Sequence, residues 1–155
     1  MRKLPMVGLG CLLIGGCAGA EATRTSANSL LIDAGAAPAC GSAGAARVAA
    51  KAAAIETIKA GYDRYIITGG AAQNNLTVTQ GPGTFRTTGM VSGGFYSGTT
   101  TYQPGFPIVA GSHDRQLGVV MFRRGDPGFE NALDARQQLG PDWQDQVKNR
   151  ILTCL

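Results

Sequence analysis

The chain has 155 residues, of which 23 are glycine, 15% are charged and 6% are aromatic. This length allows one ordinary domain and leaves little room for two. The low charge content excludes a coiled coil, and the absence of repeated apolar stretches of about 20 residues excludes a protein with several membrane-spanning helices. Collagen is excluded as well, because the glycines follow no period of three.

The N-terminus resembles the signal of a bacterial lipoprotein. A short positive segment, Met1-Arg2-Lys3, precedes an apolar, uncharged stretch over residues 4–16. This order is typical of a secretory signal, and the stretch is too short to span a bilayer as a mature helix. It ends in Leu13-Ile14-Gly15-Gly16-Cys17, which resembles a lipobox: an aliphatic residue, then small residues, then the cysteine whose thiol takes the diacylglyceryl group.

The lipobox predicts that residues 1–16 are a signal peptide that is removed, and that Cys17 carries acyl chains such as palmitate. An uncleaved anchor, or an ordinary signal cleaved near Ala18 or Ala20, is the alternative. The membrane is then a partner through the lipid anchor, since each buried methylene contributes about 0.8 kcal/mol. Ala18 stands where an aspartate would favour the inner membrane, so we expect the cell envelope, and the periplasmic face of the outer membrane in particular.

Charge and cysteine content are best judged after this processing. The 14 basic residues fall to 12 without Arg2 and Lys3, against 10 acidic residues, and they form no basic stripe. We therefore expect no nucleic-acid partner. Cys40 and Cys154 remain in a compartment that oxidises thiols, which predicts a disulfide between them, with two separately buried thiols as the alternative. Their wide spacing, with His113 as the only other soft ligand, favours neither a metal site nor a cofactor.

The first third of the chain predicts a tether, a strand and a helix. Residues 17–28, the lipidated cysteine and a run of small and polar residues, are expected to form the tether. Residues 29–33 are a short apolar run typical of a strand. A helix over 43–60, capped by Ser42 and ended by Gly61, is predicted from an apolar stripe at helical spacing. The stripe consists of Val48, Ala52, Ile55, Ile58 and Tyr62.

The amino-acid composition changes after residues 65–68, a β-branched run that predicts a strand. Glycine, threonine, glutamine and asparagine dominate residues 69–111, which we interpret as a flexible insertion in a single domain spanning 29–155. Two structures agree with this composition: a few short strands joined by glycine-rich turns, or a partly ordered loop. A long segment without clear secondary structure usually indicates a binding loop or disorder. Its aromatic residues could contact a sugar or a peptide, or could hold the segment on the domain. They are Phe95, Tyr96, Tyr102 and Phe106.

The last third predicts a strand and two helices. The strand covers residues 117–122, one helix begins at Asp126-Pro127 and ends at Gly140, and another begins at Pro141-Asp142. Together the elements predict an α+β fold. We expect a small mixed or antiparallel sheet, covered by the alanine-rich helix and the C-terminal helices, with the Gly/Thr-rich segment in the centre.

Two segments carry a family resemblance. They are Ala53-Ala54-Ile55-Glu56-Thr57-Ile58-Lys59-Ala60-Gly61-Tyr62-Asp63-Arg64-Tyr65 and Asn131-Ala132-Leu133-Asp134-Ala135-Arg136. Together with the lipobox, they resemble a group of small, uncharacterised bacterial envelope lipoproteins. The resemblance covers roughly residues 28–140 without the Gly/Thr-rich centre. It implies a helix end that leads into a buried strand, and it implies no catalytic residue.

No catalytic constellation stands out in the sequence. Ser112-His113-Asp114 has the residue types of a hydrolase triad, but adjacent residues of an extended segment point to alternate sides. No serine lies in a G-x-S-x-G elbow. We therefore expect a lipid-anchored envelope protein with a non-enzymatic binding or structural role and an envelope protein as its partner. An accessory lipoprotein of a secretion or surface-assembly complex and a small periplasmic hydrolase are the alternatives.

Overall fold

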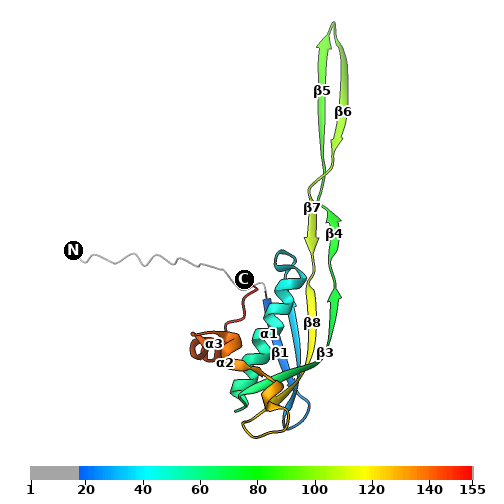
Figure 1. Cartoon of the computed structure of the whole chain (residues 1–155). Helices are drawn as coiled ribbons and strands as arrows, with labels where there is room; N and C mark the ends of the chain where they lie inside the picture. The colour runs from blue at the N-terminus through cyan, green and yellow to red at the C-terminus, as the bar shows by residue number, and fades with distance from the viewer. Residues whose placement is uncertain (1–17, 155) are drawn as a thin grey trace, which may run out of the picture.

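The computed structural model describes residues 18–154, and it shows an α+β body from which a long β arm projects (Figure 1). The signal peptide expected over 1–16 and the acylation expected at Cys17 lie outside the described residues. In chain order the elements are β1 (Ala18–Arg24), β2 (Ser29–Ala36), the 3-10 helix η1 (Pro38–Cys40), α1 (Gly41–Lys59), β3 (Arg64–Asn74), β4 (Thr77–Gln80), β5 (Thr84–Ser92), β6 (Phe95–Gln103), β7 (Pro107–Ala110), β8 (His113–Phe122), the 3-10 helix η2 (Phe129–Asn131), β9 (Leu133–Asp134), α2 (Ala135–Leu139) and α3 (Trp143–Asn149).

The body is built on a five-stranded sheet in the order β1-β2-β8-β3-β9. Every neighbouring pair in this sheet is antiparallel, so the antiparallel form of the predicted α+β fold is confirmed. β2, β3 and β8 correspond to the three strands expected from the sequence, and each is longer than predicted. Within residues 18–154, no helix is long and apolar enough to cross a membrane.

The core lies between the sheet and α1. Its largest fully buried side chains are Tyr65, Ile32, Ile55, Met121, Val48 and Val119. Alanines at 49, 52 and 53 are at most 2% exposed, and their small side chains let the helix lie close to the strands. The helix starts at Gly41 rather than behind Ser42, and no side chain caps it. Its predicted end is confirmed, because Gly61 adopts a φ of +78°, which favours glycine.

The tether predicted over residues 17–28 is wrong for its larger part, because Ala18–Arg24 forms the edge strand β1. β1 pairs with β2 from Ala18 opposite Ala36 to Arg24 opposite Leu30. Alternate alanines of β1, at positions 18, 20 and 22, are half-buried and pack against the core. The strand therefore forms because β2 offers an edge and small side chains fit over α1, although alanine and glycine have little strand preference of their own.

The single helix predicted from Asp126 to Gly140 is also wrong. The carboxylate of Asp126 accepts a hydrogen bond from the backbone N–H of Arg123 at 2.7 Å and so closes a turn instead of capping a helix. The helix α2 starts only after Asp134, whose Oδ1 accepts from the N–H groups of Arg136 at 2.9 Å and Gln137 at 3.0 Å. The last predicted helix is present as α3, in which Trp143 and Val147 pack against the core.

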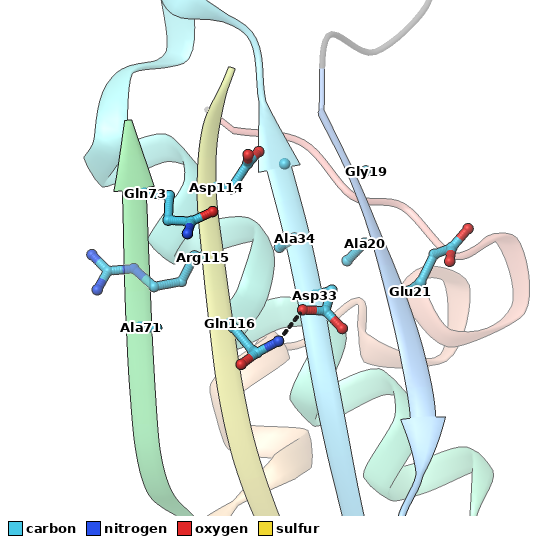
Figure 2. Close-up of a pocket in the computed structure, with 11 residues that line it drawn as sticks. Gly19, Ala20, Glu21, Asp33, Ala34, Ala71, Gln73, Asp114, Arg115 and Gln116 are labelled. Atoms are coloured by element: carbon cyan, nitrogen blue, oxygen red, sulfur yellow. Dashed lines mark hydrogen bonds between the residues drawn. The ribbon is translucent and has the colours of Figure 1, made fainter. Parts of the chain in front are cut away.

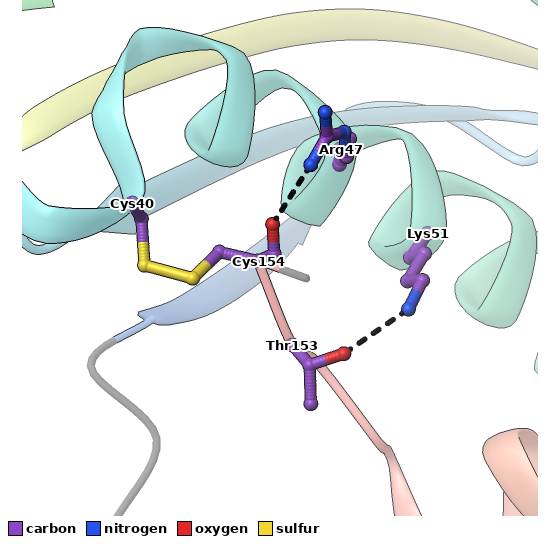
Figure 3. The surroundings of a disulfide bond; sticks show 5 residues. All are labelled: Cys40, Arg47, Lys51, Thr153 and Cys154. Carbon is purple, nitrogen blue, oxygen red and sulfur yellow. Dashed lines mark hydrogen bonds between the residues drawn. A yellow bond between two sulfur atoms is a disulfide. The ribbon is translucent and has the colours of Figure 1, made fainter.

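A disulfide ties the C-terminus to the start of α1 (Figure 3). Cys40 and Cys154 have their sulfur atoms at bonding distance and their Cα atoms 5.7 Å apart, so the predicted pair is present. Arg47 donates a hydrogen bond to the carbonyl of Cys154 at 3.2 Å, and Lys51 donates to the hydroxyl of Thr153 at 3.2 Å. A Cβ at Gly44 would lie 2.8 Å from the Cβ of Cys40, so glycine leaves room for the bond at this point.

Candidate functional site

The candidate site is the β arm, which we define as residues 75–112. It continues β3 and β8 beyond the end of the sheet and consists of two antiparallel ladders, β4 with β7 and then β5 with β6 (Figure 1). The tip is the two-residue turn Gly93-Gly94, and both residues have positive φ, 58° and 84°. Two positive φ values are typical of a type I′ turn, whose twist matches that of the flanking strands. The predicted alternative of thin strands is therefore what the central segment contains.

The arm has no core of its own. Every residue of β4, β5, β6 and β7 is exposed, including large apolar side chains such as Phe95 at 83% and Met90 at 80%. Phe106, which precedes β7, is 91% exposed. Among the described residues, no third strand pairs with either ladder. A two-stranded hairpin in water is marginally stable at best, so the arm has the properties of a segment that is completed by a partner.

One face of the β5–β6 ladder carries aromatic side chains, and we call it the aromatic face. Paired residues of an antiparallel ladder share a face, which places the following residues together: Phe85 with Tyr102, Thr87 with Thr100, Gly89 with Gly98, and Val91 with Tyr96. The rings of Phe85 and Tyr102 have centroids 5.0 Å apart at an interplanar angle of 48°. A Cβ at Gly89 or at Gly98 would lie 2.6 Å from the hydroxyl of Tyr96, so the glycine pair makes room for this ring.

The opposite face is rich in hydroxyl groups. It carries the pairs Thr84 with Gln103, Arg86 with Thr101, Thr88 with Thr99, Met90 with Ser97, and Ser92 with Phe95. Arg86 is the one charged residue in the sequence of the arm. The two faces therefore differ: one carries the rings of Tyr96, Tyr102 and Phe85, and the other carries most of the threonine and serine hydroxyls together with Met90 and Phe95.

The four aromatic residues predicted as a binding surface do not share one surface. Tyr96 and Tyr102 lie on the aromatic face, Phe95 lies on the opposite face at the tip, and Phe106 lies in the joint between the two ladders. All four are more than half exposed, so they do not hold the segment on the domain. Phe85 was not among the predicted residues, although alternation along a strand places it on the same face as Thr87 and Gly89.

Both edges of the arm have unpaired backbone groups. β9 covers the outer edge of β3 only at Arg64 and Tyr65, so within residues 18–154 this edge is open from Ile66 onward through β4 and β5. β2 covers the other edge as far as Ala36 opposite His113, and the edge is open from there through β7 and β6. Natural edge strands are usually protected by charges, above all lysine, and the arm has only Arg86.

A second candidate is a shallow hollow on the face of the sheet opposite α1, beside the root of the arm (Figure 2). The polar residues that line it are Glu21, Asp33, Gln73, Asp114, Arg115 and Gln116. Gln116 donates a hydrogen bond to Asp33 at 2.7 Å, and Asn75 donates one to Asp114 at 2.5 Å. Two of the three carboxylates thus accept hydrogen bonds from side-chain amides. Among the described residues, no nucleophile in the hollow is paired with a base.

The Ser-His-Asp sequence does not assemble into a relay. His113 and Asp114 are consecutive residues of β8, and the carboxylate of Asp114 bonds to Asn75. Over residues 18–154, no group of three or more histidine, cysteine, aspartate and glutamate side chains is arranged to hold a metal ion. Comparisons of the chain with protein-family models, with curated proteins and with solved structures found no match. The arm is the feature of the described chain that most plainly requires a functional explanation.

Proposed function

We propose that the protein is a lipid-anchored, non-enzymatic component of the bacterial cell envelope that uses its β arm to assemble with a partner at the membrane. The observation that carries the proposal is the arm itself: two ladders with almost no charge, exposed on both faces and open along both edges. Such a surface favours association, because it offers apolar side chains together with unpaired backbone groups.

The register of the sheet supports a role at the membrane. Cys17, the proposed lipid acceptor, directly precedes Ala18, the first residue of β1. Ala18 lies opposite Ala36, Ala36 lies opposite His113, and His113 lies opposite Asn74. At about 4.8 Å between neighbouring strands, the start of β1 is therefore about 15 Å from the root of the arm, at the same end of the sheet.

The arm then leaves the body at the end where the lipid would hold it (Figure 1). β1 runs from this end into the body, whereas the arm runs outward from it. At about 3.3 Å per residue, residues 75–92 extend for about 60 Å, which is more than the roughly 30 Å thickness of the hydrocarbon core. An anchored protein would thus present its arm at the level of the membrane and not toward the opposite side of the body.

These features favour an assembly role over catalysis. An accessory lipoprotein of a larger envelope complex fits the same observations, since a projecting, uncharged hairpin can add its edges to a neighbouring protein. The geometry does not support the hydrolase alternative, because the carboxylate of Asp114 is held by an amide and not by His113.

The anchor is tested by mass spectrometry of protein extracted from membranes. We expect the mature chain to begin at acylated Cys17, and the Cys17→Ser variant to lose the acyl mass and to leave the membrane fraction. A mature chain that starts at Ala18 or later contradicts the proposal of a lipid anchor.

The role of the arm is tested by chemical crosslinking in intact envelopes. Val91 lies on the aromatic face and is exposed, so Val91→Asp should abolish the crosslinked species without lowering the melting temperature of the body. Gln138→Asp places the same charge on an exposed position of α2 and should change neither. Unchanged crosslinking of the Val91→Asp variant would show that the arm is not the interaction element.

A further inference from the structure

We propose that the partner of the arm is the arm of a second copy of this chain, paired edge to edge. The β4–β5 edge of one arm would lie against the β6–β7 edge of the next arm. This inference rests on the proposed function, because it names the partner of the interaction element described above.

The polarity of the strands suits this pairing. β5 runs from the root toward the tip, and β6 returns from the tip toward the root. Two arms that project side by side in the same direction therefore place β5 of one copy antiparallel to β6 of its neighbour. The new ladder would repeat the antiparallel geometry that already holds each hairpin together.

The lipid anchor would also set the register. Every copy would be fixed to the membrane through the residue before Ala18, close to the root of the arm. Equal anchoring places equal positions of neighbouring arms at the same height, so Thr88 of one copy meets the region of Thr99 in the next. Confinement to one membrane raises the effective concentration of the copies relative to each other.

The side chains are compatible with such an array. At equal heights the neighbour presents the same pairings as the hairpin itself, so Arg86 meets Thr101 and not another arginine. Threonines would meet threonines, a favourable cross-strand pair already seen at 2.8 Å between the hydroxyl oxygens of Thr87 and Thr100. The aromatic faces of successive copies would then lie side by side on one face of the array.

A second copy would cover apolar side chains and also pair the backbone groups of the arm's edges, which other partners would do less completely. A lipid surface alone could cover the aromatic face, but it would leave the backbone groups of both edges without partners, which is costly in hydrocarbon. A different protein would have to supply an equally long and uncharged strand, whereas a copy of this chain supplies it with matching length and polarity. Because the two edges differ, the contact is heterologous: each arm still has a free edge after pairing, so the array can extend beyond two copies.

The test uses two differently tagged full-length chains, co-expressed with intact lipid signals. One chain carries Thr88→Cys on β5, and the other carries Thr99→Cys on β6. Each chain then has a single added thiol, so neither can form a new bond within its own hairpin. Mild oxidation of the envelopes should give a disulfide-linked heterodimer at roughly ten times the yield of the control pair, Thr88→Cys with Gln138→Cys on α2.

A scan fixes the register and the face. Cysteines at positions 97, 101 and 103 lie on the same face of β6 as Thr99, whereas Thr100→Cys lies on the other face. We expect one same-face position to give the highest yield and Thr100→Cys to give several-fold less. Cys17→Ser should reduce all yields to the control level, because without the lipid anchor neighbouring arms are no longer held at the same distance from the membrane.

The outcomes separate this inference from the proposed function. If no position of the scan exceeds the control while Val91→Asp still abolishes crosslinking, the arm binds a different protein and the second copy is refuted. If Val91→Asp has no effect on crosslinking, the proposed function fails as well. A heterodimer with equal yields on both faces would also refute the ordered edge pairing.

Discussion

Removal of the disulfide between Cys40 and Cys154 should strongly destabilise the body. The double variant Cys40→Ala/Cys154→Ala opens a closed loop whose ends are 114 positions apart in the sequence. In the chain-entropy model a loop of this length contributes about 4–5 kcal/mol to the free energy of unfolding. Domains of this size typically have about 5–15 kcal/mol in total, so the bond accounts for a large share.

The surrounding structure limits how much of this loss can be recovered. Without the bond, the C-terminal segment keeps the hydrogen bonds from Arg47 and Lys51 and the contacts of Leu152 with the core. The two hydrogen bonds are largely exposed to solvent and contribute about 1 kcal/mol each at most. For a body of about 100 residues, a loss of 4–5 kcal/mol lowers the melting temperature by roughly 15–30 °C.

The assay is thermal unfolding followed by circular dichroism, with thiol alkylation of the denatured, unreduced protein as a companion measurement. The wild-type chain purified from envelopes should show no alkylated thiol at Cys40 or Cys154. Arg47→Ala is the control, since it removes a hydrogen bond to the same segment but leaves the crosslink, and it should lower the melting temperature by only a few degrees. Two free thiols in the wild type, or a double variant that melts within about 5 °C of it, would refute the reasoning.

Three further perturbations test the body. Ala52→Asp places a charge at a position that is 2% exposed and should cost at least about 3 kcal/mol, whereas the neighbouring Lys51→Asp should cost less than about 1 kcal/mol; equal losses in urea unfolding would contradict the helix phase. Burial raises the pKa of Tyr65 to about 12, from 10.0, so the neutral form is favoured in the folded state. The stability from this residue is then fully present below pH 10 and is lost as the pH rises toward 12, by up to about 1.4 kcal/mol per pH unit, and Tyr65→Phe should lack this part of the alkaline slope. Asp134→Ala removes the cap of α2 and should cost about 1 kcal/mol in the same urea assay, while a loss below about 0.3 kcal/mol would show that the cap is dispensable.

The sequence was sufficient for the elements whose burial is periodic. Val48, Ala52 and Ile55 recur at helical spacing, and all three are buried in α1. The apolar runs at the cores of β2 and β8 likewise predicted strands, because a buried strand needs apolar side chains wherever it faces a helix. The cysteine pair followed from a count of thiols, and this required no knowledge of the fold.

Where a neighbour decides the structure, the sequence was not sufficient. The alanines and glycine of β1 have little strand preference, and only the free edge of β2 makes a strand of them. Asp126 followed by proline is typical of a helix start, but Gly128 adopts a φ of +93° and turns the chain before a helix can form. In both places a tertiary contact or a turn outweighed the local preference.

The arm was the hardest part to predict from the sequence, because the strand register decides which side chains share a face. Composition marked residues 69–111 as unusual and identified aromatic side chains, but not which of them share a face. The pairing of Phe85 with Tyr102 places these two rings together and sends Phe95 to the opposite side. Since a shift of one residue would exchange the faces, the glycine pair under Tyr96 has a second role besides making room. It favours one register, in which both edges of a hairpin with a single charged side chain stay open.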